Sequence, residues 1–305
     1  MATPAELIQQ VSDLVESSAE KFNGKIPALQ QKVLDELLLL LKDLDTKGDT
    51  ISATVKNVRL IGDINRKLQR IIFDEGYKKE VTQYLKAYSD ISKLQNQYFT
   101  TVIEDFKPTK LLQAIREQSI QFTLDGLTES GLIANVIEPI KGILQKSITT
   151  GGGYKELTEN LRTNLTNTDQ GDGLMSRYLK TYTITSVSQY SRNYSQTVAE
   201  GLNFRWYRYV GSNTETTRCF CLAMTEKHFF HKSEIPDILA GRFPEFKDQE
   251  CSLNSKTGLP EGMIKGTNTS NFMTYAGGWN CQHSIFPVPD SAVPQNLRDK
   301  FKNVA

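Results

Sequence analysis

Two short segments, TRCFC at 217–221 and GGWNCQH at 277–283, open and close the stretch of sequence that decides the fold of the C-terminal part of this chain. All four cysteines and all three histidines lie within residues 217–288, namely Cys219, Cys221, Cys251, Cys281, His228, His231 and His283. The sequence between them is rich in turn-forming residues. Soft sulfur and nitrogen ligands gathered in such a stretch predict that a metal ion or a disulfide holds it together.

Zinc is the metal that these residue types favour, because it binds thiolate and imidazole groups in a tetrahedral arrangement. The closing segment and the opening segment each supply two candidate ligands, and one further histidine completes the set, so the candidates are Cys281, His283, Cys219, Cys221 and His231 or His228. The spacings C-x-C and C-x-H are tighter than those of a standard zinc finger. Two alternatives remain: reduced, buried cysteines with His283 in the core, or a disulfide such as Cys221–Cys281.

Composition and charge narrow the class of protein. The chain of 305 residues has a formal net charge of +1, which provides no general argument for binding nucleic acid or an anionic membrane. Its longest apolar run, 37–41, is far shorter than the roughly 20 residues that span a bilayer. The first residues lack the features of a signal peptide, so we expect synthesis in a reducing cytosol, where zinc is favoured over a disulfide.

The first half of the chain has the pattern of a helical domain, 1–150. Thr3, Pro4 and Glu6 form a helix-start signature, in which Thr3 and Glu6 make a capping box. Apolar residues at helical spacing then predict helices over about 28–44, 51–72 and 78–106, followed by shorter helices up to 149. These helices form either a bundle or an extended arm. The near-heptad stripe of the helix at 78–106 favours packing inside the molecule over pairing with a partner helix.

Three consecutive glycines at 151–153 predict a hinge, which continues with a short helix and a polar loop to residue 173. The remainder, 174–305, is predicted to be a smaller α+β module. It begins with a helix over 174–200, and the alternating, aromatic segment 204–210 and the segment 284–288 are strand candidates that can pair. The fold class is therefore mainly α, with a short antiparallel sheet and a Cys/His-rich knot in the C-terminal module.

The region 177–218 combines six Lys or Arg with only two Glu, and it holds six of the twelve tyrosines. Arginines interleaved with aromatic side chains can bind single-stranded nucleic acid through charge and stacking. The candidates for such a contact are Arg192, Arg205 and Arg208. The alternative, which we favour, is a half-buried helix and strand whose tyrosines pack in a core.

A catalytic interpretation needs a nucleophile or an open metal position, together with a base. Cys281 with His283 can be regarded as a thiolate pair, and Glu226 or Glu234 as a base beside a metal. The sequence contains no HExxH, GxSxG or Walker motif. We therefore expect no enzymatic activity, and a zinc- or thiol-dependent enzyme domain on a helical scaffold is the alternative.

The two cysteine-containing segments also carry a resemblance to a known family. The pattern Thr-Arg-x-Phe-Cys at 217–221, the closing GGWNCQH and the FPV that follows at 286–288 resemble the C-terminal module of phage Mu F-like minor head (head morphogenesis) proteins. The strand segment WYRYVG at 206–211 and KSEI at 232–235 are similar as well, so the resemblance covers about residues 174–290. Two departures are Gln282, where the family usually has Arg, and the added Cys219. The family cysteine corresponds to Cys221, which places Cys221, Cys281 and His283 first among the metal candidates.

The resemblance implies a structural phage virion protein that is associated with the portal. Such a protein is made in the host cytoplasm, lies inside the head near the portal vertex, and acts in head assembly and genome packaging or delivery. Its expected partners are the portal protein, other head proteins and packaged DNA, with Arg192, Arg205 and Arg208 as candidate contacts. One structural zinc is the expected cofactor, and neither a membrane nor a small-molecule substrate is expected.

Overall fold

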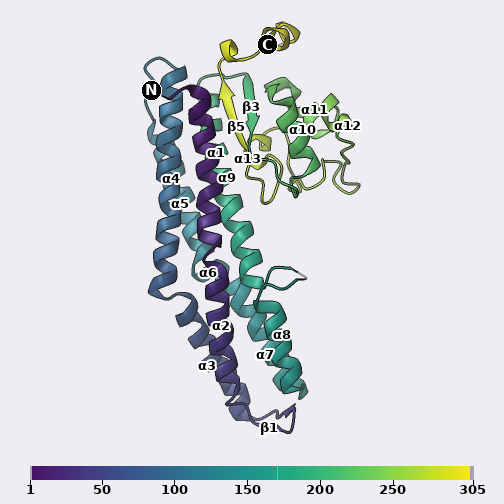
Figure 1. Ribbon diagram of the computed structural model, residues 1–305. Helices are drawn as coiled ribbons and strands as arrows, with labels where there is room; N and C mark the ends of the chain where they lie inside the picture. The colour runs from purple at the N-terminus through teal and green to yellow at the C-terminus, as the bar shows by residue number, and fades with distance from the viewer. Residues whose placement is uncertain (1, 170, 303–305) are drawn as a thin grey trace. The chain divides into compact units, whose positions relative to one another are not determined.

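The computed structural model describes residues 2–169 and 171–302, and it is mainly helical with a small antiparallel sheet in the C-terminal part (Figure 1). The predicted fold class, including the Cys/His cluster in the C-terminal part, is confirmed. The chain divides into two compact units. Unit 1 comprises Met1–Ser18, Lys86–Ile120 and Ile184–Ala305, and unit 2 comprises Ala19–Leu85 and Gln121–Thr183. Both units use non-consecutive segments, whereas the sequence predicted the consecutive domains 1–150, 151–173 and 174–305.

The units are built from the following elements. Four helices contribute residues to both units: α1 (Pro4–Asn23), α4 (Glu75–Val102), α5 (Lys110–Leu127) and α9 (Leu174–Gly201). Unit 2 also contains α2 (Ile26–Leu41), β1 (Thr46–Lys47), β2 (Thr50–Ile51), α3 (Val55–Ile72), α6 (Glu129–Leu132), the π-helix η1 (Ile133–Ile137), α7 (Glu138–Thr150) and α8 (Tyr154–Leu165). Unit 1 also contains β3 (Trp206–Val210), α10 (Cys219–Lys227), β4 (Phe229–His231), η2 (Lys232–Glu234), α11 (Ile235–Leu239), α12 (Pro244–Asp248), α13 (Phe272–Tyr275), β5 (Ser284–Val288), η3 (Asp290–Ala292) and α14 (Gln295–Lys300).

The start of α1 is the capping box that the sequence predicts. The backbone N–H of Thr3 donates to the Glu6 carboxylate (2.7 Å), and the backbone N–H of Glu6 donates to the Thr3 hydroxyl (3.3 Å). The start of α3 differs from the prediction. Its N-cap is Thr54, and residues 46–51, of which the last was expected to be helical, form the β1–β2 hairpin instead. The hairpin therefore forms even though the helical spacing of apolar residues extends back to Ile51.

The three glycines at 151–153 lie inside unit 2. Gly151 ends α7 in the left-handed conformation (φ 67°), which favours glycine. The backbone N–H of Ile51 donates to the carbonyl of Gly152 (3.0 Å), and Gly153 bridges to Thr50. The segment predicted as a hinge is thus hydrogen-bonded to β2 and within one compact unit.

Helix α4 buries its apolar stripe, as the sequence favoured. Val81, Tyr88 and Ile91 are 2 %, 0 % and 0 % exposed. Gln95, which interrupts the stripe, is fully buried and donates its Nε2 to the carbonyl and hydroxyl of Ser191 on α9 (2.8 and 3.0 Å). Its amide donor is thus satisfied inside the core, whereas its Oε1 is buried without a hydrogen-bond partner among the described residues.

The sheet of unit 1 has the strand order β4-β3-β5, and both pairings are antiparallel. Trp206 pairs with Val288 and Val210 with Ser284, so the two strand candidates from the sequence do close the Cys/His stretch. Along β3 the side chains alternate between two faces. Tyr207 and Tyr209 enter a core formed with residues from α10 to β5, including Phe220, Cys221, Met224, Phe230, Ile238, Phe272, Cys281 and Ile285.

None of the helices in the described ranges is both long enough and apolar enough to cross a membrane.

Candidate metal centre

The potential metal ligands are Cys221 on α10 and Cys281 and His283 in the segment just before β5. They are 2 %, 3 % and 6 % exposed, respectively. The antiparallel pairing of β3 with β5 brings the segment before β5 to the end of β3, and α10 packs on the same core. Two segments far apart in the sequence therefore meet at one buried point.

The geometry of these three residues fits a metal ion. The two sulfurs are 3.9 Å apart, Cys281 Sγ lies 3.9 Å from His283 Nδ1, and all three donor atoms lie within 4.8 Å of one another. Zinc bonds of about 2.3 Å to sulfur and about 2.0 Å to nitrogen, at tetrahedral angles, place ligand atoms about 3.5–3.8 Å apart. The cluster can therefore hold a metal ion of this size without a large rearrangement.

Tyr209 on β3 covers the same cluster. Its hydroxyl lies 3.4 Å from Cys221 Sγ and 3.6 Å from Cys281 Sγ, and its ring stacks on His283 with centroids 5.3 Å apart. Complete burial raises the pKa of the Tyr209 phenol well above its ordinary value, so the hydroxyl stays protonated and can donate to a sulfur. The alternation of side chains along the predicted strand was the sequence signal that could have identified Tyr209 as a residue of the buried face.

Asn213 orients the imidazole of His283. His283 Nε2 lies 3.3 Å from Asn213 Oδ1. With this oxygen as acceptor, Nε2 carries the proton, and the lone pair of Nδ1 faces Cys281. A hydrogen bond from the far nitrogen of a histidine is the usual way in which proteins orient this residue as a metal ligand.

The pKa values of the two buried thiols are shifted in opposite directions. The hydrogen bond between them is the main cause that lowers the pKa of Cys281 well below the ordinary thiol value, and it also raises the pKa of Cys221. His283 and Arg192 lower the pKa of Cys281 further. Cys281 is therefore the sulfur that is more readily present as a thiolate, the form that binds metal.

Gly277 is required next to the sulfurs for a steric reason. A Cβ at this position would lie 2.3 Å from Cys221 Sγ and 3.0 Å from Cys281 Sγ. The neighbouring Gly278 has φ 96°, in the left-handed region that favours glycine, and a Cβ there would lie 2.0 Å from the carbonyl oxygen of Gly262. The paired glycines therefore allow the closing turn to approach the sulfurs.

Arg192 on α9 has a different role from the one predicted. It is 1 % exposed, so in the folded chain it is not a surface contact for DNA or for a portal protein. Its Nη1 donates to the carbonyls of Cys281 (3.0 Å) and His283 (2.7 Å), and its Nε donates to the carbonyl of Thr274 (2.7 Å). One buried guanidinium thus holds the backbone of both candidate ligands in the closing segment. Nothing in the local sequence distinguished Arg192 from a surface arginine.

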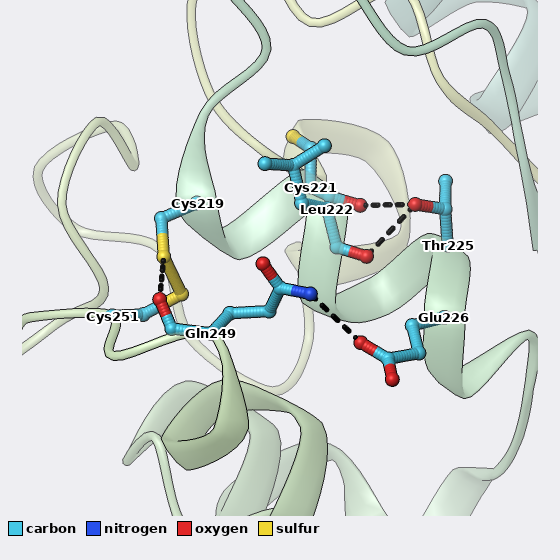
Figure 2. The surroundings of a disulfide bond; sticks show 7 residues. All are labelled: Cys219, Cys221, Leu222, Thr225, Glu226, Gln249 and Cys251. Carbon is cyan, nitrogen blue, oxygen red and sulfur yellow. Dashed lines mark hydrogen bonds between the residues drawn. A yellow bond between two sulfur atoms is a disulfide. The ribbon is translucent and has the colours of Figure 1, made fainter.

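Cys219 is not a metal ligand, because it forms a disulfide with Cys251 (Figure 2). Side chains two residues apart on a helix point to nearly opposite sides, and in Figure 2 the sulfur of Cys221 points away from this disulfide. The disulfide considered from sequence, Cys221–Cys281, is absent, and both residues are free cysteines. The structure therefore contains both a disulfide and a cluster of three potential metal ligands, whereas the sequence favoured zinc over a disulfide.

His231 does not join the cluster either. Its Nδ1 lies 2.8 Å from the Ser233 hydroxyl, and its ring packs against Trp206 with centroids 5.1 Å apart. The pattern of residues therefore overestimated the number of ligands. Within the described residues, the donors that converge are Cys221, Cys281 and His283.

The other two arginines predicted as contacts are separate from the cluster. Arg205 is exposed and forms an ion pair with Asp290 (2.9 Å). Arg208 is half-buried and lines a surface groove beside α1 and α4. With Arg192 buried, the three arginines do not form one basic surface.

Removing the disulfide tests its contribution to stability. We expect Cys251→Ser to lower the free energy of unfolding by about 2–4 kcal/mol, because the disulfide closes a long loop in the unfolded chain. Gln249 would still donate to Glu226 on α10 (2.9 Å) and retain part of this connection (Figure 2). Urea unfolding followed by tryptophan fluorescence measures the change. An unchanged midpoint would mean that the disulfide does not form in solution.

No family model, no curated protein and no solved structure matches this chain.

Proposed function

We propose that this protein is a structural phage virion protein of the Mu F-like minor head class, associated with the portal and acting in head assembly and in genome packaging or delivery. The observation that carries the proposal is that the two motifs behind the resemblance meet in the fold. Arg218 of the opening motif donates to the carbonyl of Gly277 in the closing motif (2.9 Å), and the cysteine of each motif contributes to the same buried cluster. This contact supports the interpretation of the two motifs as parts of one structural unit.

The cluster is assigned one structural zinc, held by Cys221 Sγ, Cys281 Sγ and His283 Nδ1. A zinc ion held there would supply a cross-link between α10 and the segment before β5. Around it, Tyr209 and Asn213 orient the ligands, and Arg192 holds their backbone. The burial of all three ligands supports a structural site, although a closed structural site ordinarily has a fourth ligand.

The enzymatic alternative has less support from the surroundings of the cluster. The Glu226 carboxylate accepts from Gln249, and the Glu234 carboxylate accepts from the backbone N–H of His231 (2.7 Å) and pairs with Lys227 (2.9 Å). Both predicted bases are therefore engaged by other residues, and neither belongs to the group of converging donors. A substrate would also need to reach thiols that are 2 % and 3 % exposed.

The functional proposal is tested in the genome that encodes the chain, by inducing particle production with and without the gene. We expect the protein in purified particles at few copies relative to the major capsid protein, and we expect co-purification of a tagged chain with the portal protein of the same genome. Deletion of the gene should reduce the yield of DNA-filled heads, and wild-type complementation should restore it. Normal, DNA-filled particles that lack the protein would contradict the proposal.

A further inference from the structure

A surface groove of about 520 Å³ lies in unit 1, on the face of the sheet opposite the metal cluster. Its walls come from the start of α1, the end of α4, β4 and the segment that follows β5. The apolar lining consists of Pro4, Ala5, Ile8, Val102, Phe229, Val288, Pro289 and Ala292. This volume lies in the range of about 300–1,000 Å³ that is typical of small-molecule sites.

One cation, Arg208, lies among these apolar side chains. No hydrogen bond or ion pair joins its guanidinium to any residue in the part of the chain that the structure describes, and its Nε has no contact with solvent. Burial lowers the pKa of Arg208, which means that the surroundings disfavour its charged form. An anion in the groove would compensate this charge through charge-assisted hydrogen bonds to the terminal nitrogens.

The hydroxyl groups of the groove are largely engaged within the protein. Tyr98 donates to the carbonyl of Pro287 (2.5 Å), Thr101 donates to the carbonyl of Tyr98 (2.6 Å), and Thr3 donates to Glu6 (3.0 Å). The amides of a peptide or the bases of an oligonucleotide would lose hydrogen bonds to water there and find few replacements. An unbranched alkyl chain has no such polar groups.

We propose that the groove between α1, α4 and the β3–β5 sheet binds a small amphipathic carboxylate, such as a medium-chain fatty acid, with the carboxylate on Arg208 and the alkyl chain along the apolar walls. The resemblance to minor head proteins led us to expect no small-molecule substrate, and the groove has no local sequence signal because its residues are scattered from Thr3 to Ala292. The proposal does not rest on the virion function.

The test is calorimetric titration of the full chain with decanoate, decanol and decylamine. We expect decanoate to bind and both decanol and decylamine to bind at least about tenfold more weakly, because only decanoate brings the anion. Arg208→Gln should weaken decanoate binding by about tenfold or more. Arg205→Gln is the matched control, because Arg205 is exposed, pairs with Asp290 and does not line the groove, so binding should be unchanged.

A second variant, Ala5→Trp, fills the groove and leaves Arg208 in place. It should abolish decanoate binding, and circular dichroism checks that both variants remain folded. Equal binding of decanol and decanoate, or full binding by Arg208→Gln, would overturn the proposal. So would binding of a short single-stranded oligonucleotide that depends on Arg208 while decanoate does not bind.

Discussion

Cys281→Ser should lose all bound zinc, whereas the wild-type chain should hold one zinc ion. Serine is a poor zinc ligand, and the two donors that remain, on Cys221 and His283, cannot hold the ion in a tetrahedral site. Because the ion binds only the folded arrangement, its loss also lowers the free energy of unfolding, by about 3 kcal/mol or more. Elemental analysis after dialysis measures the metal.

Stability is measured in the same samples by urea unfolding. Both tryptophans of the chain, Trp206 and Trp279, lie in unit 1, so their fluorescence reports on the unit that contains the cluster. Cys251→Ser is the matched control for zinc content, since it removes a cysteine of the disulfide and should retain the zinc although it lowers stability. Wild-type protein without metal, together with unchanged stability of Cys281→Ser, would exclude the zinc site and any enzyme activity that depends on it.

The second large effect is expected for Arg192→Met, which removes the buried guanidinium behind the cluster. The buried carbonyls of Cys281 and His283 would then have no donor, and the partly buried carbonyl of Thr274 would lose its donor as well. Each unsatisfied buried acceptor costs about 1–3 kcal/mol, so the free energy of unfolding should fall by about 2–6 kcal/mol. Zinc affinity should fall as well, because the carbonyls of Cys281 and His283 belong to two of the three ligand residues.

Two further variants separate this effect from a general loss of positive charge. Arg192→Lys keeps the charge but cannot reach all three carbonyls, so its stability and zinc affinity should be intermediate. Arg205→Met removes an exposed arginine in a surface ion pair and should change stability by less than about 1 kcal/mol. Equal effects of Arg192→Met and Arg205→Met would show that Arg192 does not hold the closing segment.

The structural and enzymatic interpretations can be separated at the same cluster. A purely structural zinc should exchange slowly with chelator, since its three ligands are 2–6 % exposed, and its removal should unfold unit 1 rather than stop a reaction. The Tyr209 hydroxyl contacts both sulfurs, at 3.4 Å from Cys221 Sγ and 3.6 Å from Cys281 Sγ. A metal analysis should therefore next determine whether a protein group or a water molecule occupies the fourth coordination position.

Much of the secondary structure could be predicted from the sequence, since helix and strand signals depend on near neighbours. The capping box at Thr3, the helix from Leu174 and the strand Ser284–Val288 were all predicted to within one residue. The β1–β2 hairpin was missed, because an apolar residue at Ile51 continued the helical period. The three glycines at 151–153 suggested flexibility, yet hydrogen bonds to β2 hold them within unit 2.

For the candidate site, the sequence by itself determined the residue types, the two motifs and the preference for Cys221, Cys281 and His283. Only the tertiary structure decided which cysteines pair. Two residues on α10 differ by about 200° in direction, so Cys219 reaches Cys251 while Cys221 reaches Cys281. The tertiary structure also decided that Arg192 is buried and donates to the backbone of Cys281 and His283. The burial and the partners of a guanidinium depend on segments that lie far away in the sequence, so the local sequence could not predict this role.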